Sequence, residues 1–224
     1  MTLEKKEVLP GTDPWQEQQP RQIQRRTAFT PVSWGLIGIS VALFAVELLG
    51  VRLAELGVLW GPALAQGQWW RLVTWILLHG NLLHLAFNLS VVWTLGRGLE
   101  HAMQPARFAL VSMVGALGSA AFVLLFDFAR PTLGLSGVIL AWAGVALPML
   151  DRRGRREMWV WLAQVLVISL LPGVSWAAHL GGFLSGAVVG LAVRYRAVRF
   201  SRALPIVAFV CGVLVLVALR RHQG

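Results

Sequence analysis

The chain has 224 residues, of which 57% are hydrophobic and only 13% are charged. This composition is too apolar for an ordinary soluble domain and indicates a membrane protein. The single cysteine, Cys211, excludes an internal disulfide framework and a cysteine-rich metal site. The net charge of +10 does not indicate a nucleic-acid partner, because the arginines fall in particular loops rather than on one basic surface.

The first fifty residues divide into a polar tail and a first predicted helix. Residues 1–29 are polar and rich in Pro and Gln, so we expect a disordered tail and no cleavable signal peptide. An apolar segment follows from 31 to about 50, close to the ~20 residues that a helix needs to cross a bilayer. Thr30 can cap this helix, and Pro31 suits its first turn.

The rest of the chain alternates between connectors and apolar segments. A semi-apolar connector, 51–68, contains Trp60 and is expected to lie in the headgroup layer. The later apolar segments predict five more helices of a six-helix core and a short seventh helix at the C-terminal end. Together they predict an all-α polytopic membrane protein. The expected ranges are 71–96, 107–126, 136–150, 158–171, 176–194 and 204–219.

Positive charge is distributed unevenly among the connectors. Nearly neutral connectors alternate with Arg-rich stretches, which are the tail and residues 97–107, 151–156 and 194–202. Positively charged connectors stay on the cytoplasmic side, so the pattern predicts a multi-pass protein with a cytoplasmic N-terminus. We expect the membrane to be a bacterial inner membrane.

Three polar side chains are expected at one depth in this membrane. Ser136 and His179 each lie fifteen residues before a charged cytoplasmic residue, and His84 lies thirteen residues before Arg97. At ~1.5 Å per residue, all three lie roughly 20 Å above the cytoplasmic boundary of a ~30 Å core. Asn88 follows His84 by about one helical turn and shares its face. The serine helix is shorter than the bilayer, which predicts a water-filled pocket opening outward over Ser136.

These residue types suit nucleophilic catalysis. A serine needs a base to become a nucleophile, and His179 supplies one. The oxyanion of the tetrahedral intermediate needs donors, which the Ser136 backbone N–H, the His84 imidazole and the Asn88 amide can supply. No carboxylate is expected at this depth, so the arrangement would be a Ser–His dyad rather than a triad. We expect neither a metal ion nor another cofactor.

Glycines are expected to bring the serine and histidine helices together. Gly182, Gly186 and Gly190 recur at every fourth position and form a small-residue stripe. Small residues let membrane helices approach closely, so packing is the expected role of the stripe. The expected partners on the serine helix are Gly137 and Gly144.

Each candidate residue also has a purely structural explanation. A serine between glycines is common where membrane helices pack. His84 and Asn88 could hydrogen-bond neighbouring helices, and His79 could be an interfacial residue. An intramembrane histidine is costly unless it has a partner, and this cost favours a functional role for such a residue. The combination at one depth favours catalysis over these separate explanations.

Over about 32–194 the sequence resembles the rhomboid intramembrane serine proteases. The resemblance is carried by Trp70-Arg71, His79-x-x-x-x-His84-x-x-x-Asn88, Gly96 with Glu100, Gly134-Leu135-Ser136-Gly137 and Ala178-His179-x-x-Gly182-x-x-x-Gly186. It implies that 30–195 is a catalytic domain of six helices that cleaves transmembrane helices of other proteins. The implied dyad is Ser136 with His179, and the implied oxyanion site is His84, Asn88 and the Ser136 backbone.

The resemblance also implies structural roles. Residues 51–71 would be a membrane-embedded loop, Pro172–Ala178 a mobile cap, and the fifth helix part of a substrate gate. Glu100 would be a hydrogen-bonding residue near the cytoplasmic end of the second helix. The other implied structural positions are Arg71, Gly134, Gly137, Gly182 and Gly186.

One residue departs from the family pattern. Many members carry an aromatic residue four positions after the serine, stacked on the catalytic histidine, where this chain has Leu140. This lends some support to an alternative, an inactive rhomboid-like protein that binds membrane clients. A transporter is a third class, and it would be expected to have more intramembrane carboxylates than Glu47 alone.

Residues 196–224 are expected to form a basic loop and the seventh helix. The sequence indicates neither the substrate nor the oligomeric state.

Overall fold

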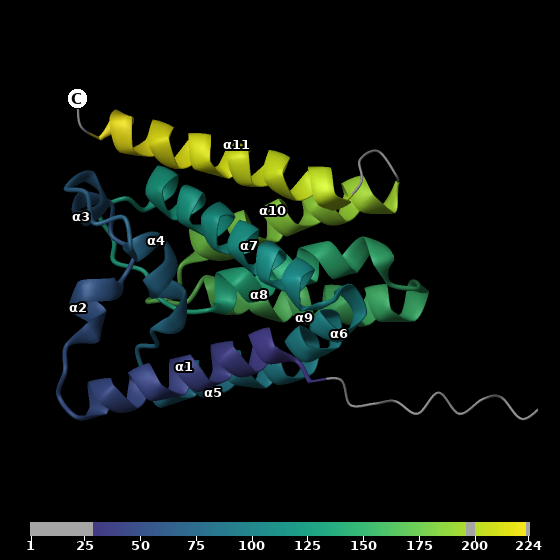
Figure 1. Ribbon diagram of the computed structural model, residues 1–224, viewed down its shortest axis with the longest axis horizontal. Coiled ribbons are helices and arrows are strands. Elements are labelled where there is room, and N and C mark those ends of the chain that lie inside the picture. The colour runs from purple at the N-terminus through teal and green to yellow at the C-terminus, as the bar shows by residue number, and fades with distance from the viewer. Residues whose placement is uncertain (1–28, 196–199, 223–224) are drawn as a thin grey trace, which may run out of the picture.

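The computed structural model describes residues 29–195 and 200–222, so the predicted tail lies almost entirely outside the described residues. The described chain is helical, and its one strand-like feature is an isolated antiparallel bridge between Leu59 and Thr132. Figure 1 shows the long helices lying side by side, with α11 along one side of the bundle. The helices are α1 (Pro31–Leu48), α2 (Leu53–Gly57), α3 (Gly61–Ala65), α4 (Arg71–Thr74), η1 (Trp75–Leu77), α5 (Leu82–Val91), η2 (Val92–Gly96), α6 (Arg97–Met103), α7 (Pro105–Phe126), α8 (Ser136–Ala146), η3 (Leu147–Met149), α9 (Arg152–Ser169), α10 (Trp176–Arg194) and α11 (Phe200–Arg221).

The described helices confirm an all-α polytopic membrane protein with a seventh C-terminal helix. Four of them, α1, α7, α10 and α11, are long and apolar enough to cross a membrane. A bent pair, Arg71–Leu77 with Leu82–Met103, passes the same test when its two parts are taken together, and α8 with η3 forms a shorter apolar helix. The predicted seventh segment is longer than expected, because α11 begins at Phe200 rather than 204 and ends at Arg221.

The predicted second span, 71–96, is wrong at both ends. Its two parts meet at an angle of 94°, so 71–77 belongs to the connector. The new helix begins after Asn81, whose side chain accepts a hydrogen bond of 2.8 Å from the His84 backbone N–H, as an N-cap does. It continues through the π-helical η2 to Met103, because Gly96 remains in helical geometry.

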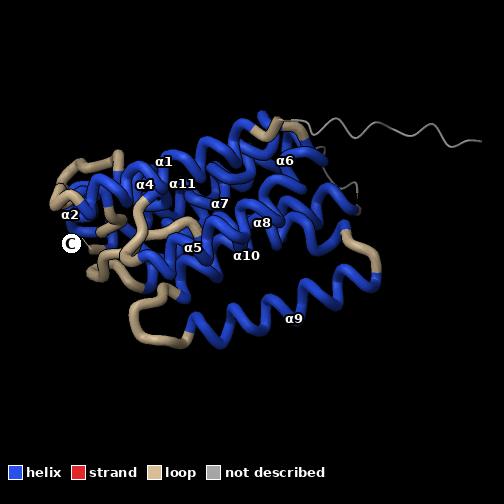
Figure 2. The backbone as a smooth tube through the Cα atoms, turned by 90° about the horizontal axis from the view of Figure 1, so that it is seen from below, coloured by secondary structure: helices blue, strands red, loops and turns tan. Residues whose placement is uncertain are grey.

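The predicted basic loop 151–156 is also largely helical. The Asp151 side chain accepts a hydrogen bond of 2.8 Å from the Gly154 backbone N–H and caps α9, which therefore begins at Arg152. The helix ends at Ser169, two residues before the predicted limit. Figure 2 shows α9 at one edge of the bundle, and only Val165 and Ser169 of this helix are buried.

Glu100 joins the start of α1 to α6. Its carboxylate is fully buried and accepts hydrogen bonds from the Val32 N–H at 2.9 Å, the Ser33 N–H at 2.8 Å and the Ser33 hydroxyl at 2.7 Å. A carboxylate at a helix N-terminus accepts hydrogen bonds from the free backbone N–H groups, and its negative charge interacts favourably with the helix dipole. Glu100 thus has the hydrogen-bonding surroundings that the family resemblance implies for it.

We predict that Glu100→Gln destabilises the protein by about 2 kcal/mol, because the amide NH₂ replaces one charged acceptor and faces a backbone donor. The measurement is the midpoint of thermal unfolding in detergent micelles. Glu157→Gln is the matched control, since Glu157 pairs with Arg153 on an exposed helix surface and should leave the midpoint unchanged. Equal midpoints for the two variants would contradict the role of Glu100.

Candidate active site

Ser136 is the first residue of α8 and follows a tight turn. Gly134 has a φ of +117°, a conformation that side chains rarely adopt, and its N–H donates to the Trp75 carbonyl at 2.9 Å. Leu135 is buried at the N-cap position but offers no capping side chain. The first N–H groups of a helix have no partner inside the helix, so those of α8 can donate to a negative charge placed beside Ser136.

The turn before Ser136 is held by the connector between α1 and α5. Leu59 and Thr132 exchange two backbone hydrogen bonds of 2.9 Å, and the Gly61 N–H donates to the Phe128 carbonyl at 3.1 Å. These bonds satisfy irregular backbone that cannot be exposed to lipid. Arg71 is buried and secures the same connector, donating to the Glu55 and Val58 carbonyls at 2.7 and 2.8 Å.

The α8–α10 contact is the closest helix packing around the serine. A Cβ at Gly182 would overlap the Gly137 carbonyl oxygen, and one at Gly186 would overlap the Ala141 carbonyl oxygen. A Cβ at Gly144 would likewise overlap the Phe183 carbonyl oxygen. The glycine stripe therefore packs on the helix that was expected, with backbone against backbone.

This packing places His179 beside Ser136. The His179 imidazole Nε2 lies 2.8 Å from the Ser136 Oγ, within hydrogen-bond distance. His179 is 9% exposed and lies in the first turn of α10, where the Ser175 side chain caps the helix. The two residues come from different helices, separated by all of α9, and their contact is the geometry that a serine nucleophile and its base require.

Sequence reasoning missed a third residue at the other side of the imidazole. The Ser169 hydroxyl oxygen, at the end of α9, lies 2.6 Å from His179 Nδ1. Serine carries no charge and fits no catalytic motif at this spacing, so no pattern in the sequence indicated it. The predicted Ser136–His179 pair thus has a further hydrogen-bonding partner.

His84 and Asn88 face the serine turn from α5. A Cβ at Gly134 would lie 2.6 Å from His84 Cε1 and 3.9 Å from Asn88 Nδ2, so both side chains border the backbone two residues before Ser136. Asn88 is buried, and its Nδ2 donates to the His84 carbonyl at 3.1 Å. An amide nitrogen has two N–H groups, so the second remains for another acceptor.

His79 lies behind His84 rather than at the serine. Its ring is 1% exposed, its Nδ1 lies 3.3 Å from the Leu77 carbonyl, and its centroid is 5.1 Å from that of His84. The edge-to-face arrangement packs one imidazole against the other. His79 therefore supports the position of His84.

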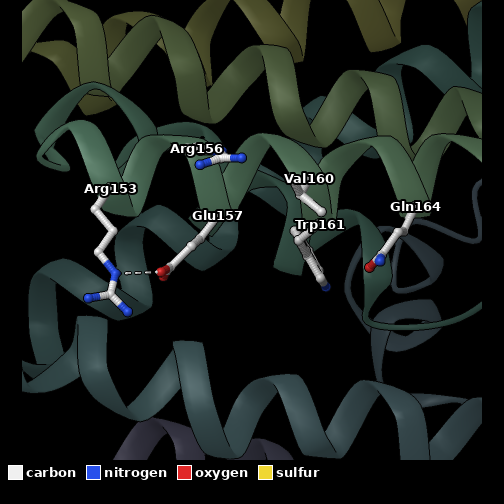
Figure 3. A pocket seen from close by; sticks show the side chains of 6 residues that line it. All are labelled: Arg153, Arg156, Glu157, Val160, Trp161 and Gln164. Atoms are coloured by element: carbon white, nitrogen blue, oxygen red, sulfur yellow. Dashed lines mark hydrogen bonds and ion pairs between the residues drawn. The ribbon is translucent and has the colours of Figure 1, made fainter.

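Neither of two cavities in the described structure lies over Ser136, where the sequence predicts a pocket. One cavity of about 510 Å³ is lined by His79, Gly80 and Leu133, close to the serine turn, and by the end of α1. The other, of about 500 Å³, lies along α9, where Glu157, Trp161 and Gln164 point to the same side of the helix (Figure 3). Ser136 and His179 line neither of them.

A polytopic helical bundle with a half-buried serine hydrogen-bonded to a histidine defines a narrow class of membrane protein. The family model described as the rhomboid domain matches residues 66–196, which include Ser136, His179, His84 and Asn88. This match covers more than half of the chain, and the chain belongs to the rhomboid family. The resemblance of its motifs is thereby confirmed at the level of the family.

Several curated proteins are similar to the chain. Rhomboid protease GluP of Bacillus subtilis is 32% identical over 132 residues, which cover 55% of this chain and 26% of that protein. Rhomboid protease AarA of Providencia stuartii is 23% identical, with 79% of each chain covered. RHOMBOID-like protein 5 of Arabidopsis thaliana is 31% identical, covering 64% of this chain and 50% of that protein. The chain thus spans about a quarter to four fifths of these relatives.

We predict that Gly186→Ala destabilises the protein by about 1–3 kcal/mol, because its Cβ overlaps the Ala141 carbonyl oxygen and forces α8 and α10 apart. The readout is again the midpoint of thermal unfolding in micelles. Gly38→Ala is the matched control: Gly38 also lies inside a helix, but nothing lies within 4 Å of its Cβ position. The control should raise the midpoint slightly, since alanine favours helix. A Gly186→Ala midpoint equal to the control would contradict the tight packing.

Proposed function

We propose that the chain is an intramembrane serine endopeptidase that cleaves transmembrane helices of other membrane proteins. The observation that carries the proposal is the 2.8 Å contact between His179 Nε2 and Ser136 Oγ. The names of its relatives support it, since GluP and AarA are both called rhomboid proteases. The proposed catalytic domain is 30–195, and 196–224 supplies the additional helix.

In the proposed mechanism, His179 Nε2 removes the Ser136 hydroxyl proton while Oγ bonds to the carbonyl carbon of the scissile peptide. The C–N bond of the tetrahedral intermediate then breaks, and His179 gives its proton to the leaving nitrogen. The product is a Ser136 ester and a released amine fragment. Water then attacks the ester, with His179 again as base, and frees the acid fragment and the serine.

Donors around the serine turn would stabilise the oxyanion. The backbone N–H of Ser136 begins α8, and the free N–H of Asn88 and the imidazole of His84 border the same turn. Donors held in place before the reaction are worth more inside a water-poor site than in water, because they need no reorganisation. His84 and Asn88 are therefore the proposed oxyanion residues.

The orientation in the membrane also belongs to the proposal. Arginine occupies the start of α9 at positions 152, 153, 155 and 156, while the connectors near Ser136 are almost neutral. The positive-inside rule then places the N-terminus in the cytoplasm and the serine toward the outer leaflet. We propose a bacterial inner membrane as the setting. We also propose that the substrate helix unwinds near its outer end, because the carbonyl of a helical peptide bond is already hydrogen-bonded and shielded.

The alternative is a rhomboid-family protein that binds membrane clients without cleaving them. Loss of the aromatic residue at Leu140 favours this alternative. The intact pairing of Ser136 and His179 argues against it, because a binding protein does not need a serine hydrogen-bonded to an imidazole. Reaction of Ser136 with a serine-directed probe separates the two functions.

We predict that a fluorophosphonate probe labels the purified full chain and that Ser136→Ala abolishes the labelling. His179→Ala should lower it at least 100-fold, because the serine loses its base. Both variants should also fail to cleave a single-span substrate with helix-breaking residues near its outer end. The control is Ser90→Ala, whose exposed hydroxyl bonds only within its own helix. Labelling that survives in Ser136→Ala would overturn the proposed nucleophile, and an unlabelled wild type would favour the client-binding alternative.

We predict that Asn88→Ala lowers kcat about 100-fold with little change in KM, because the lost donor acts on the oxyanion of the transition state. The measurement is steady-state cleavage of the same substrate in micelles. Asn81→Asp is the control, since aspartate preserves the N-cap of α5 on which Asn88 lies. An Asn88→Ala variant that changes only KM would remove Asn88 from the oxyanion site.

A further inference from the structure

Ser169 is in an unusual place for a polar residue. It is the last residue of α9, and it is 5% exposed although most of this helix faces away from the bundle. Its hydroxyl contacts the Val165 carbonyl one turn earlier at 2.7 Å and His179 Nδ1 at 2.6 Å. The first contact is a common local bond of helical serines, but the second reaches another helix.

Counting protons determines the direction of both bonds. A hydroxyl has one proton, and a backbone carbonyl can only accept, so Ser169 donates to Val165. Toward His179 the hydroxyl oxygen must then act as acceptor, which requires a proton on Nδ1. In a neutral imidazole the other nitrogen is then unprotonated. Nε2 therefore presents its lone pair to the Ser136 hydroxyl, as a general base must.

We propose that Ser169 is a positioning residue that holds the His179 ring in the Nδ1–H tautomer with Nε2 directed at Ser136. The inference rests on the proposed function, since it assigns a role within that same site. Ser136, His179 and Ser169 come from α8, α10 and α9, so the chain of bonds crosses three helices. The end of α9 thereby contributes to the orientation of the base.

The effect should be moderate, for an electrostatic reason. When His179 takes the serine proton, Nδ1–H continues to donate to a neutral hydroxyl. A carboxylate in this position would attract the imidazolium charge, whereas serine orients the ring and offers only a dipole. Loss of Ser169 should therefore cost far less than loss of His179 itself. The Ser169–His179 bond orients the base and is already present before substrate binds. Loss of Ser169 should therefore lower kcat and leave KM unchanged.

The chain offers a matched control for the local bonding pattern. Ser112 is also buried in a helix and donates to a carbonyl one turn earlier, that of Phe108, at 2.8 Å. It also accepts a bond from a ring nitrogen of another helix, Trp142 Nε1, at 3.0 Å. The two serines therefore differ in the ring that they contact, and Trp142 takes no part in the proposed chemistry.

The experiment compares Ser169→Ala, Ser169→Thr and Ser112→Ala in the full chain, using the helix-destabilised substrate in micelles. We expect Ser169→Ala to lower kcat about tenfold with KM unchanged, the loss expected from one buried hydrogen bond. Ser169→Thr restores the hydroxyl and should recover most of kcat. Ser112→Ala should keep the wild-type kcat, whatever its effect on thermal stability.

A spectroscopic readout tests the tautomer without relying on activity. Nitrogen-15 spectra of ring-labelled histidine distinguish protonated from unprotonated ring nitrogens, and the His179→Ala spectrum identifies the signals of His179. We expect Nδ1 to be protonated in the wild type and in Ser169→Thr, and a mixture of tautomers in Ser169→Ala.

Two results would overturn the role of Ser169. One is a Ser169→Ala protein that keeps both the wild-type kcat and the Nδ1–H tautomer. The other is an equal loss of kcat in Ser169→Ala and Ser112→Ala with no change of tautomer, which would assign Ser169 to packing alone. If the wild type neither cleaves nor reacts with the fluorophosphonate, the proposed function fails, and the tautomer spectrum alone decides the inference about Ser169.

Discussion

The structure depends above all on the close packing of α8 against α10. Gly182 and Gly186 present bare backbone to the Gly137 and Ala141 carbonyl oxygens, and any side chain there would separate the helices. In a membrane the hydrophobic effect does not drive helices together, so small residues and close van der Waals contact provide the association. This contact determines how near His179 can come to Ser136, and the 2.8 Å bond between them is its chemical consequence.

Buried polar side chains keep the surrounding irregular backbone in place. Arg71 secures the connector after α1, and Glu100 secures the beginning of α1 itself. Each of the two side chains hydrogen-bonds two backbone groups. An apolar environment makes unsatisfied backbone expensive, so such residues are needed wherever a helix begins or a loop enters the bundle. The turn at Gly134 benefits from this support, because the same connector pairs with the residues that precede it.

The histidine is held by neighbours on both sides of its ring. Its Nε2 faces Ser136 on α8 and its Nδ1 faces Ser169 on α9, so three helices determine its orientation. Leu140 stands where many rhomboid proteins have an aromatic residue stacked on the catalytic histidine. The Ser169 contact offers another means of orienting it, one that acts through a hydrogen bond instead of ring stacking. Val165 and Ser169 are the buried residues of α9, and this bond joins the end of that helix to α10.

The sequence by itself determined the class of protein, the existence of most of the long helices and the pairing of Ser136 with His179. Hydrophobic length and the position of charge act along the chain, so a shared depth for Ser136, His179 and His84 could be inferred from residue counts. The tertiary structure alone decided the 94° bend before Leu82, the start of α9 at Arg152 and the partner of His179 Nδ1. These features depend on caps and on the rotation of one helix against another. Ser169 lies ten residues before His179, with a loop between their two helices. Such a loop can place the serine on any side of the histidine, so the spacing in the sequence does not reveal the contact.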